Sequence, residues 1–206
     1  MLRALLMVTV PFTTLLAGTQ ASPSPYQPTG KILLAQVPID DAMKAIKAGE
    51  LAKLQKAAED GDLESQAKLG VMYYWGDGAP LDWNQAKIWL RKASERGHPD
   101  AQAKLGAMYF LGQGGERDLE SAIRWFRAAA EQGEPYAEGC MGVMYAVGEG
   151  VPKDLFQAYV WLLQAQAGGD TDAAEPCQQV KSHLTPAQIR EGERLASEAM
   201  KNRVHN

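Results

Sequence analysis

The stretch "AKLGAMYFLGQGGERDLESAIRWFRAAAEQG" (103–133) decides the fold, because a related stretch lies 36 residues before it and another 36 residues after it. The three copies align without a gap. Ten positions carry the same residue in every copy: Gly70/Gly106/Gly142, Met72/Met108/Met144, Tyr73/Tyr109/Tyr145, Gly76/Gly112/Gly148, Gly78/Gly114/Gly150, Asp82/Asp118/Asp154, Ala86/Ala122/Ala158, Trp89/Trp125/Trp161, Ala93/Ala129/Ala165 and Gly97/Gly133/Gly169. Self-similarity at one fixed period is typical of a solenoid, in which each unit packs on its neighbours.

Each copy predicts two helices, which in the first copy run from about Ser65 to Trp75 and from about Asp82 to Arg96. The repeated aspartate suits a helix N-cap, because its carboxylate accepts hydrogen bonds from free first-turn amides. The glycine that follows each second helix suits a left-handed C-terminal residue. Another glycine recurs inside each first helix, where it costs about 1 kcal/mol relative to alanine. Its repeated use indicates that two helices approach closely there, and the repeated tryptophan is interpreted as packing.

The connector "GEGVPKD" (148–154) resembles a phosphate-binding loop at first sight. A P-loop requires lysine and a hydroxyl residue directly after its last glycine, between a strand and a helix. The equivalent connectors read "GDGAPLD" (76–82) and "GQGGERD" (112–118), and helices precede all three. We therefore interpret these glycines as sharp turns between packed helices.

The repeated pattern A-x-A-x-L-G-x-M-Y-x-x-G-x-G-x-x-x-D-x-x-x-A-x-x-W-x-x-x-A-x-x-x-G resembles the Sel1-like repeat, a relative of the tetratricopeptide repeat. The resemblance implies an all-α, right-handed α/α solenoid that acts as a protein-binding scaffold or adaptor rather than as an enzyme, with no cofactor and no bound metal. The predicted segments are a signal peptide (1–21), a proline-rich linker with a short apolar segment (22–39), a partial N-terminal repeat (40–64), three repeats (65–100, 101–136 and 137–172) and C-terminal capping helices (173–206).

The first helices of such a solenoid line a concave groove that can hold a peptide or a helix. By analogy with the tetratricopeptide pattern, the resemblance implies a partner-binding groove that contains Glu64, Val71, Tyr74, Asp100, Ala107, Phe110, Tyr136 and Val143. This row is apolar and aromatic at its centre and acidic at one end, so it suits an amphipathic segment with some positive charge. The alternative is that these side chains pack on one another or on residues 31–39.

Composition narrows the class of partner. The formal net charge is −4, which argues against nucleic acid or anionic lipid as the main partner. Residues 1–21 have an early arginine, an apolar run and small residues near Ala21, as a secretory signal peptide does. The apolar run is too short for a good membrane span. We expect an exported protein, periplasmic or secreted, in the bacterial cell envelope, with an uncleaved N-terminal anchor as the alternative.

Two further features of the sequence bear on chemistry: an S-x-x-K motif and a pair of cysteines. Ser65 and Lys68 match the S-x-x-K motif of lactam-processing enzymes, but no S-D-N or K-T-G follows. A cell-wall enzyme is therefore the alternative function, with a structural subunit of an envelope assembly as a third reading.

Cys140 and Cys177 lie on successive predicted first helices and could form a disulfide in an exported protein. Adjacent helix axes are usually 8–10 Å apart, which is wide for a disulfide, and this favours free thiols.

Overall fold

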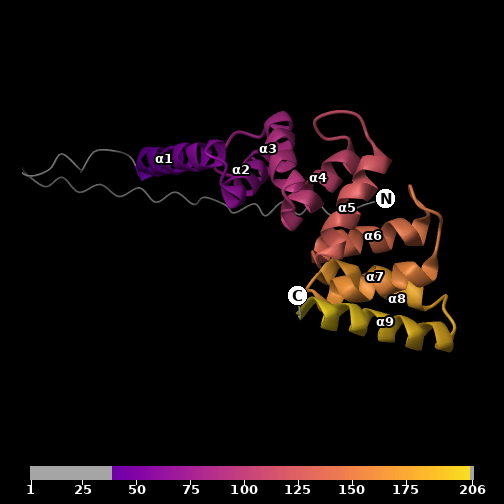
Figure 1. Cartoon of the computed structure of the whole chain (residues 1–206). Coiled ribbons are helices and arrows are strands. Elements are labelled where there is room, and N and C mark those ends of the chain that lie inside the picture. Colours follow the sequence, from indigo (N-terminus) through magenta and orange to yellow (C-terminus); the bar gives the residue numbers. More distant parts are fainter. Residues whose placement is uncertain (1–38, 205–206) are drawn as a thin grey trace, which may run out of the picture. The chain divides into compact units, whose positions relative to one another are not determined.

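The computed structural model describes residues 39–204, and these residues form helices and short connectors with no strand among them. The predicted signal peptide (1–21) and nearly all of the predicted linker (22–39) lie outside the described residues. The elements are α1 (Ile39–Glu59), α2 (Leu63–Trp75), α3 (Trp83–Glu95), α4 (Pro99–Leu111), α5 (Leu119–Glu131), α6 (Pro135–Val147), α7 (Leu155–Ala167), the 3₁₀ helix η1 (Thr171–Ala173), α8 (Ala174–Lys181) and α9 (Pro186–Val204) (Figure 1).

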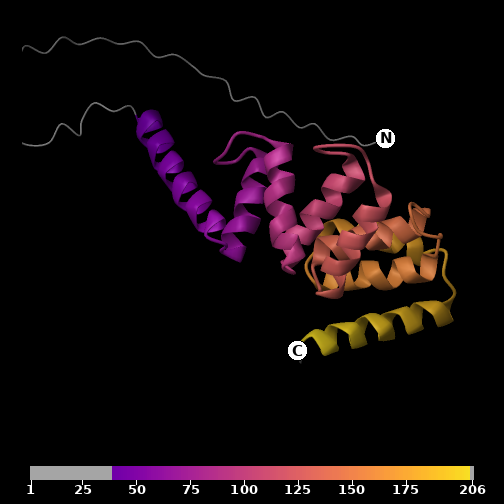
Figure 2. The same ribbon diagram turned by 45° about the horizontal axis from the view of Figure 1, so that its top comes forward.

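Three helix pairs, α2–α3, α4–α5 and α6–α7, form the repeats, and each begins 36 residues after the one before. Helices of one pair pack tightly, and each pair packs on the next through α3 with α4 and α5 with α6. Helix α1 precedes the first pair and packs on α2, while α8 and α9 both pack on α7 (Figure 2). The fold is therefore an all-α repeat solenoid, as the periodicity predicts.

The glycine inside each first helix lies where that helix touches its partner. A Cβ atom added at Gly70 would lie 2.7 Å from Cγ of Leu90, and one added at Gly142 would lie 2.6 Å from Cγ of Leu162. At Gly106 the nearest atom is Cδ1 of Phe126, at 2.9 Å. These separations confirm the predicted close approach, because any side chain here would collide with a buried residue of the second helix.

The connector after each first helix is held in the same way in all three repeats. The C-cap residues Gly76, Gly112 and Gly148 have φ values of 71°, 71° and 81°, a left-handed conformation that glycine adopts without strain. The amide of Asp82 then donates a hydrogen bond to the carbonyl of Tyr73 at 3.0 Å, and the equivalent bond recurs in the other repeats. The interpretation of these glycines as turns is confirmed.

The repeated aspartate caps the second helix, as predicted. Oδ1 of Asp82 accepts hydrogen bonds from the amides of Asn84 and Gln85 at 2.9 and 3.0 Å. Asp82→Ala is expected to lower the free energy of unfolding by about 1 kcal/mol, because both amides lose their partner. Urea unfolding followed by circular dichroism measures this, with Asp77→Ala in the same connector as the control. Equal losses in the two variants would contradict the capping role.

Consecutive repeats are joined by a buried glutamine. Nε2 of Gln66 donates to the carbonyl of Ala58 at 3.0 Å, and Nε2 of Gln102 donates to the carbonyl of Ser94 at 3.1 Å. Both glutamines are buried. The recurrence of this bond shows that α1 occupies, relative to α2, the place that α3 occupies relative to α4.

The third repeat breaks this pattern, because Glu138 stands where the glutamine is expected and a carboxylate cannot donate. Arg203 of α9 replaces the missing donor: its Nη2 donates to the carbonyl of Ala130 at 3.4 Å and to Oε1 of Gln164 at 2.7 Å. The same guanidinium forms an ion pair with Glu138, which is fully buried. Burial raises the pKa of Glu138 to about 7, although Arg203 opposes the rise. The end of α9 is thereby attached to the third repeat.

Candidate functional site

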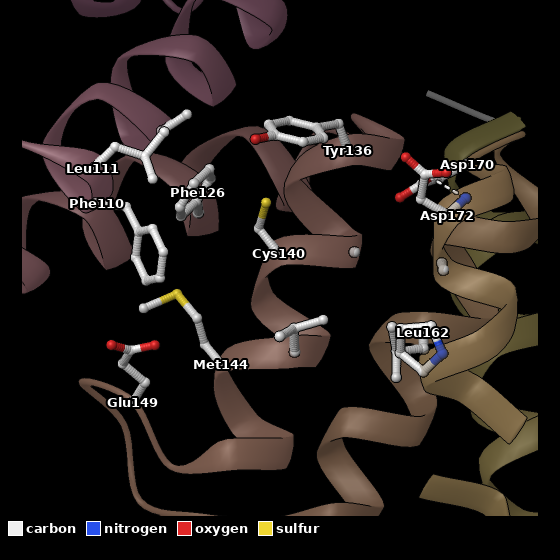
Figure 3. Close-up of a pocket in the computed structure, with 15 residues that line it drawn as sticks. Phe110, Leu111, Phe126, Tyr136, Cys140, Met144, Glu149, Leu162, Asp170 and Asp172 are labelled. Carbon is white, nitrogen blue, oxygen red and sulfur yellow. Dashed lines mark hydrogen bonds between the residues drawn. The ribbon is translucent and has the colours of Figure 1, made fainter. Parts of the chain in front are cut away.

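A cavity of about 290 Å³ opens between α4, α6 and the η1–α8 segment. Its walls are mainly apolar, and acidic side chains stand at its edge (Figure 3). We call it the α4–α6 pocket, and it is lined by Ala107, Phe110, Leu111, Phe126, Tyr136, Gly139, Cys140, Val143, Met144, Glu149, Leu162, Asp170, Asp172, Ala173 and Pro176.

The pocket exists because small residues occupy its floor while large ones stand at its sides. First helices of successive repeats contact one another far less than the two helices of one pair do, so side chains must fill the space between α4 and α6. Ala107, Gly139 and Ala173 leave part of that space empty. Gly139 leaves room for Asp170, because a Cβ atom there would lie 2.4 Å from Oδ2 of Asp170 and that side chain would have to shift. Phe126 and Met144 are buried side chains that also line the pocket.

The acidic side chains at the edge differ in their surroundings. Glu149 forms an ion pair with Arg117, whose Nε also donates to the carbonyl of Phe110 at 2.8 Å. Asp170 accepts a hydrogen bond from the amide of Asp172 through Oδ1, at 3.0 Å, and so caps η1. Asp170 and Asp172 form no salt bridge among the described residues. The edge is therefore neutralised on the Glu149 side and remains negative on the Asp170–Asp172 side.

The wall formed by α6 carries two groups that stay uncharged at neutral pH. Burial raises the pKa of the Cys140 thiol to about 12, and the same cause raises the pKa of Tyr136. The Tyr136 ring packs edge-on against Phe126 with centroids 6.3 Å apart, and Nζ of Lys104 lies 4.7 Å from its centroid. This wall offers contact area and a hydroxyl, and it supplies no reactive thiolate.

The structure brings together half of the residues that the resemblance implies for the groove. Ala107, Phe110, Tyr136 and Val143 line the pocket. Tyr74 is 8% exposed and packs inside the core of the first two repeats, so it supports the fold rather than a free surface. The remaining predicted groove residues, which lie on α2 and at the start of α4, are outside the pocket lining: Glu64, Val71 and Asp100.

Most of the pocket lining lies outside the predicted groove row. Leu111 lies one residue beyond the predicted groove row, and Asp170, Asp172 and Pro176 belong to the segment in which the repeat pattern fades. The sequence does carry one sign of Leu111, because a large apolar residue occupies its repeat position in all three copies, as Trp75, Leu111 and Val147. The structure shows that all three side chains are exposed. Nothing in the sequence pattern places the η1–α8 segment beside α6.

The two cysteines are free thiols. Cys140 of α6 is half-buried against the core cluster of the second and third repeats, whereas Cys177 of α8 is buried in a separate cluster with Tyr159 and Leu162. The alternative of a Cys140–Cys177 disulfide is therefore not found in the structure. The register of the repeat places Cys177 on a closing helix that packs on α7 rather than on α6.

The described residues contain neither a lactam-processing site at Ser65 and Lys68 nor a metal site. Ser65 belongs to the first turn of α2, where its amide donates to Oδ2 of the N-cap Asp62 at 2.8 Å. Lys68 is exposed, and neither residue lines the α4–α6 pocket. Among the side chains that the structure describes, no three from His, Cys, Asp or Glu gather closely enough to hold a metal ion. None of the described helices has the length and apolar character to cross a membrane.

Comparison with known proteins agrees with this architecture. The Sel1 repeat family matches residues 63–98, 99–134 and 140–170. A protective antigen present in uropathogenic Escherichia coli strains, which displays an SLR fold, is 32% identical with a TM-score of 0.67; the alignment covers 73% of this chain but 32% of the antigen. A Sel1 repeat protein from Oxalobacter formigenes is 38% identical with a TM-score of 0.56, over 63% of this chain and 98% of that protein. A search of curated proteins gives no match. Three repeats of one pattern, folded as three stacked helix pairs, show that the chain belongs to the Sel1 repeat family.

Proposed function

We propose that this protein is a binding scaffold whose α4–α6 pocket seats an apolar side chain of a partner protein. Sel1 repeat proteins generally mediate protein–protein interaction, and the proposal assigns that general role to one surface of this chain. A partner segment would lie along the first helices, with its anchor between Phe110 and Val143.

The exposed apolar side chains at the pocket carry this proposal. Leu111 is 58% exposed, while Tyr136 and Val143 are each 41% exposed, and all three lie around one cavity. Apolar groups left in water around a cavity are typical of a protein interface, because covering them releases free energy. A central pocket that receives one large side chain is the usual form of an interface hot spot.

We also propose that the protein acts outside the cytoplasm, in the periplasm or as a secreted protein of the cell envelope. The support is the pattern of residues 1–21: an early arginine, an apolar run and small residues before a plausible cleavage point at Ala21. Signal-dependent export of the full chain, followed by N-terminal sequencing of the mature protein, tests this.

Leu111→Ser is expected to abolish capture of the partner while the protein stays folded, because this side chain is exposed and lines the pocket. The control is Leu81→Ser, since Leu81 is 59% exposed but lies in a connector outside the pocket. The measurement is cross-linking of the full chain in its native compartment, followed by identification of the captured protein, with circular dichroism of each variant. Retention of the same partner by Leu111→Ser would show that binding occurs on another surface.

A further inference from the structure

We propose that the partner segment carries a lysine or arginine within about one helical turn of its apolar anchor, and that Asp170 and Asp172 receive this cation. This inference rests on the proposed function of the α4–α6 pocket and adds a charge requirement to it. Three features of the pocket edge support it: the sign of its charge, the position of that charge and the absence of a salt-bridge partner for it among the described residues.

The charge around the pocket is unevenly distributed. Glu149 is paired with Arg117, whose guanidinium also stacks 4.8 Å from the ring centroid of Phe110. That side of the edge therefore has a net charge close to zero, and its carboxylate already has a cationic partner. Cys140 lies between two sides of the pocket (Figure 3). Phe110 and Leu111 are on one side, and Asp170 and Asp172 are on the other, at the η1–α8 segment. A segment lying in the pocket would meet apolar groups on one side and two carboxylates on the other.

The carboxylate of Asp170 is held at the pocket by the backbone. Asp170 caps η1 through Oδ1, and its Oδ2 lies over the bare Cα of Gly139. Gly139 stands where the earlier repeats have Ala67 and Ala103. The glycine thus makes room for a carboxylate at the edge of the pocket floor. Asp172 is exposed and lies within η1, two residues after Asp170.

The nearby cation does not neutralise this side. Lys104 lies over the Tyr136 ring, and it shares its surroundings with Asp100 and Glu134, which both contribute negative charge there. The acids on this side outnumber the lysine, so a basic segment is attracted and an acidic one is repelled. Complementary charge at an interface selects partners and orients them, more than it adds raw affinity. The pocket therefore favours an apolar anchor with a basic neighbour.

Four fluorescent 14-residue peptides of alanine and glutamine test the inference directly. Each carries Phe or Ser at its centre, with either two Lys or two Glu residues three and four positions away. We expect the Phe–Lys peptide to bind about tenfold more tightly than the Phe–Glu peptide in fluorescence anisotropy at low salt. The two Ser peptides should bind at least tenfold more weakly than Phe–Lys, because they lack the anchor.

The protein variant that tests the carboxylates is Asp170→Asn with Asp172→Asn, because asparagine retains the cap of η1. We expect the preference for Lys over Glu to fall below about threefold in this variant. Arg117→Gln with Glu149→Gln is the matched control and should keep the full preference, since this ion pair contributes no net charge to the pocket edge.

The outcomes separate the inference from the function on which it rests. Equal binding of Phe–Lys and Phe–Glu, lost in Leu111→Ser, would overturn the charge requirement and leave the pocket as the binding site. A Lys preference unchanged in the double variant would also overturn it, because the cation would then be received elsewhere. If none of the Phe peptides binds at millimolar concentration, both the charge requirement and the pocket's role are wrong.

Discussion

Glu138→Gln is expected to raise the free energy of unfolding by about 2 kcal/mol at pH 8 and to change it little at pH 5. The substitution restores the glutamine that occupies this position in the first two repeats. Gln66 and Gln102 donate to carbonyls of the preceding second helix, and a glutamine at 138 can donate to Ala130 in the same way. It also removes a buried carboxylate, whose charged form is costly away from water, and it leaves the partly exposed Arg203 with Ala130 and Gln164 as hydrogen-bond acceptors.

The pH dependence follows from the pKa of Glu138. Burial raises this pKa to about 7 in the folded protein, against about 4.3 for an unfolded chain. Between about pH 4.5 and pH 7, Glu138 is therefore protonated in the folded state and ionised in the unfolded state. The contribution of this pKa shift to the free energy of unfolding is fully present below about pH 4.5 and is lost as the pH rises through about 7. One pKa unit corresponds to about 1.4 kcal/mol, so the roughly two units between pH 5 and the folded pKa correspond to a loss of about 2–3 kcal/mol, and the value of about 7 already includes the opposing effect of Arg203.

Urea unfolding at pH 5 and pH 8 measures this difference for the parent chain and for Glu138→Gln. Glu149→Gln is the control, because Glu149 is partly exposed and paired on the surface. A lower stability of Glu138→Gln at pH 8 would contradict the prediction. It would mean that the ion pair with Arg203 is worth more than the cost of burying the carboxylate.

Gly142→Ala is expected to destabilise the protein by about 1 kcal/mol net, although alanine is the better helix former. The added Cβ would lie 2.6 Å from Cγ of Leu162 and 3.2 Å from the carbonyl oxygen of Ala158. Leu162 is fully buried, so it cannot move aside into solvent. Overpacking of this kind costs about 1–3 kcal/mol, which exceeds the gain of about 1 kcal/mol in helix propensity.

Gly49→Ala provides the matched control, because Gly49 also lies inside a helix but has no atom within 4 Å of an added Cβ. We expect this variant to gain about 0.5–1 kcal/mol. Thermal and urea unfolding of the two variants gives opposite signs for the same chemical change. Stabilisation by Gly142→Ala would show that α6 and α7 can separate without loss, contrary to the close approach described above.

The sequence by itself determined the repeat unit, its two helices, their caps and the turns between them. These features depend on interactions over a few residues, such as Asp82 with the two following amides, or Gly76 in a left-handed turn. Because the unit repeats every 36 residues, each weak local pattern occurs three times and is recognised more easily. The close contacts of Gly70 and its equivalents were predicted for the same reason, because a costly residue was kept at one position in every copy.

The pocket and the attachment of α9 were decided by the tertiary structure alone. The predicted groove row included Phe110 and Val143, but also Tyr74, which the packing of the first two repeats buries. Asp170 and Asp172 reach the pocket because η1 and α8 replace a regular fourth repeat. Arg203 meets Glu138 across 65 positions of sequence with no periodic relation between them. Local preference and period specify each unit, whereas contacts between units and the irregular closing segment depend on how the chain packs in three dimensions.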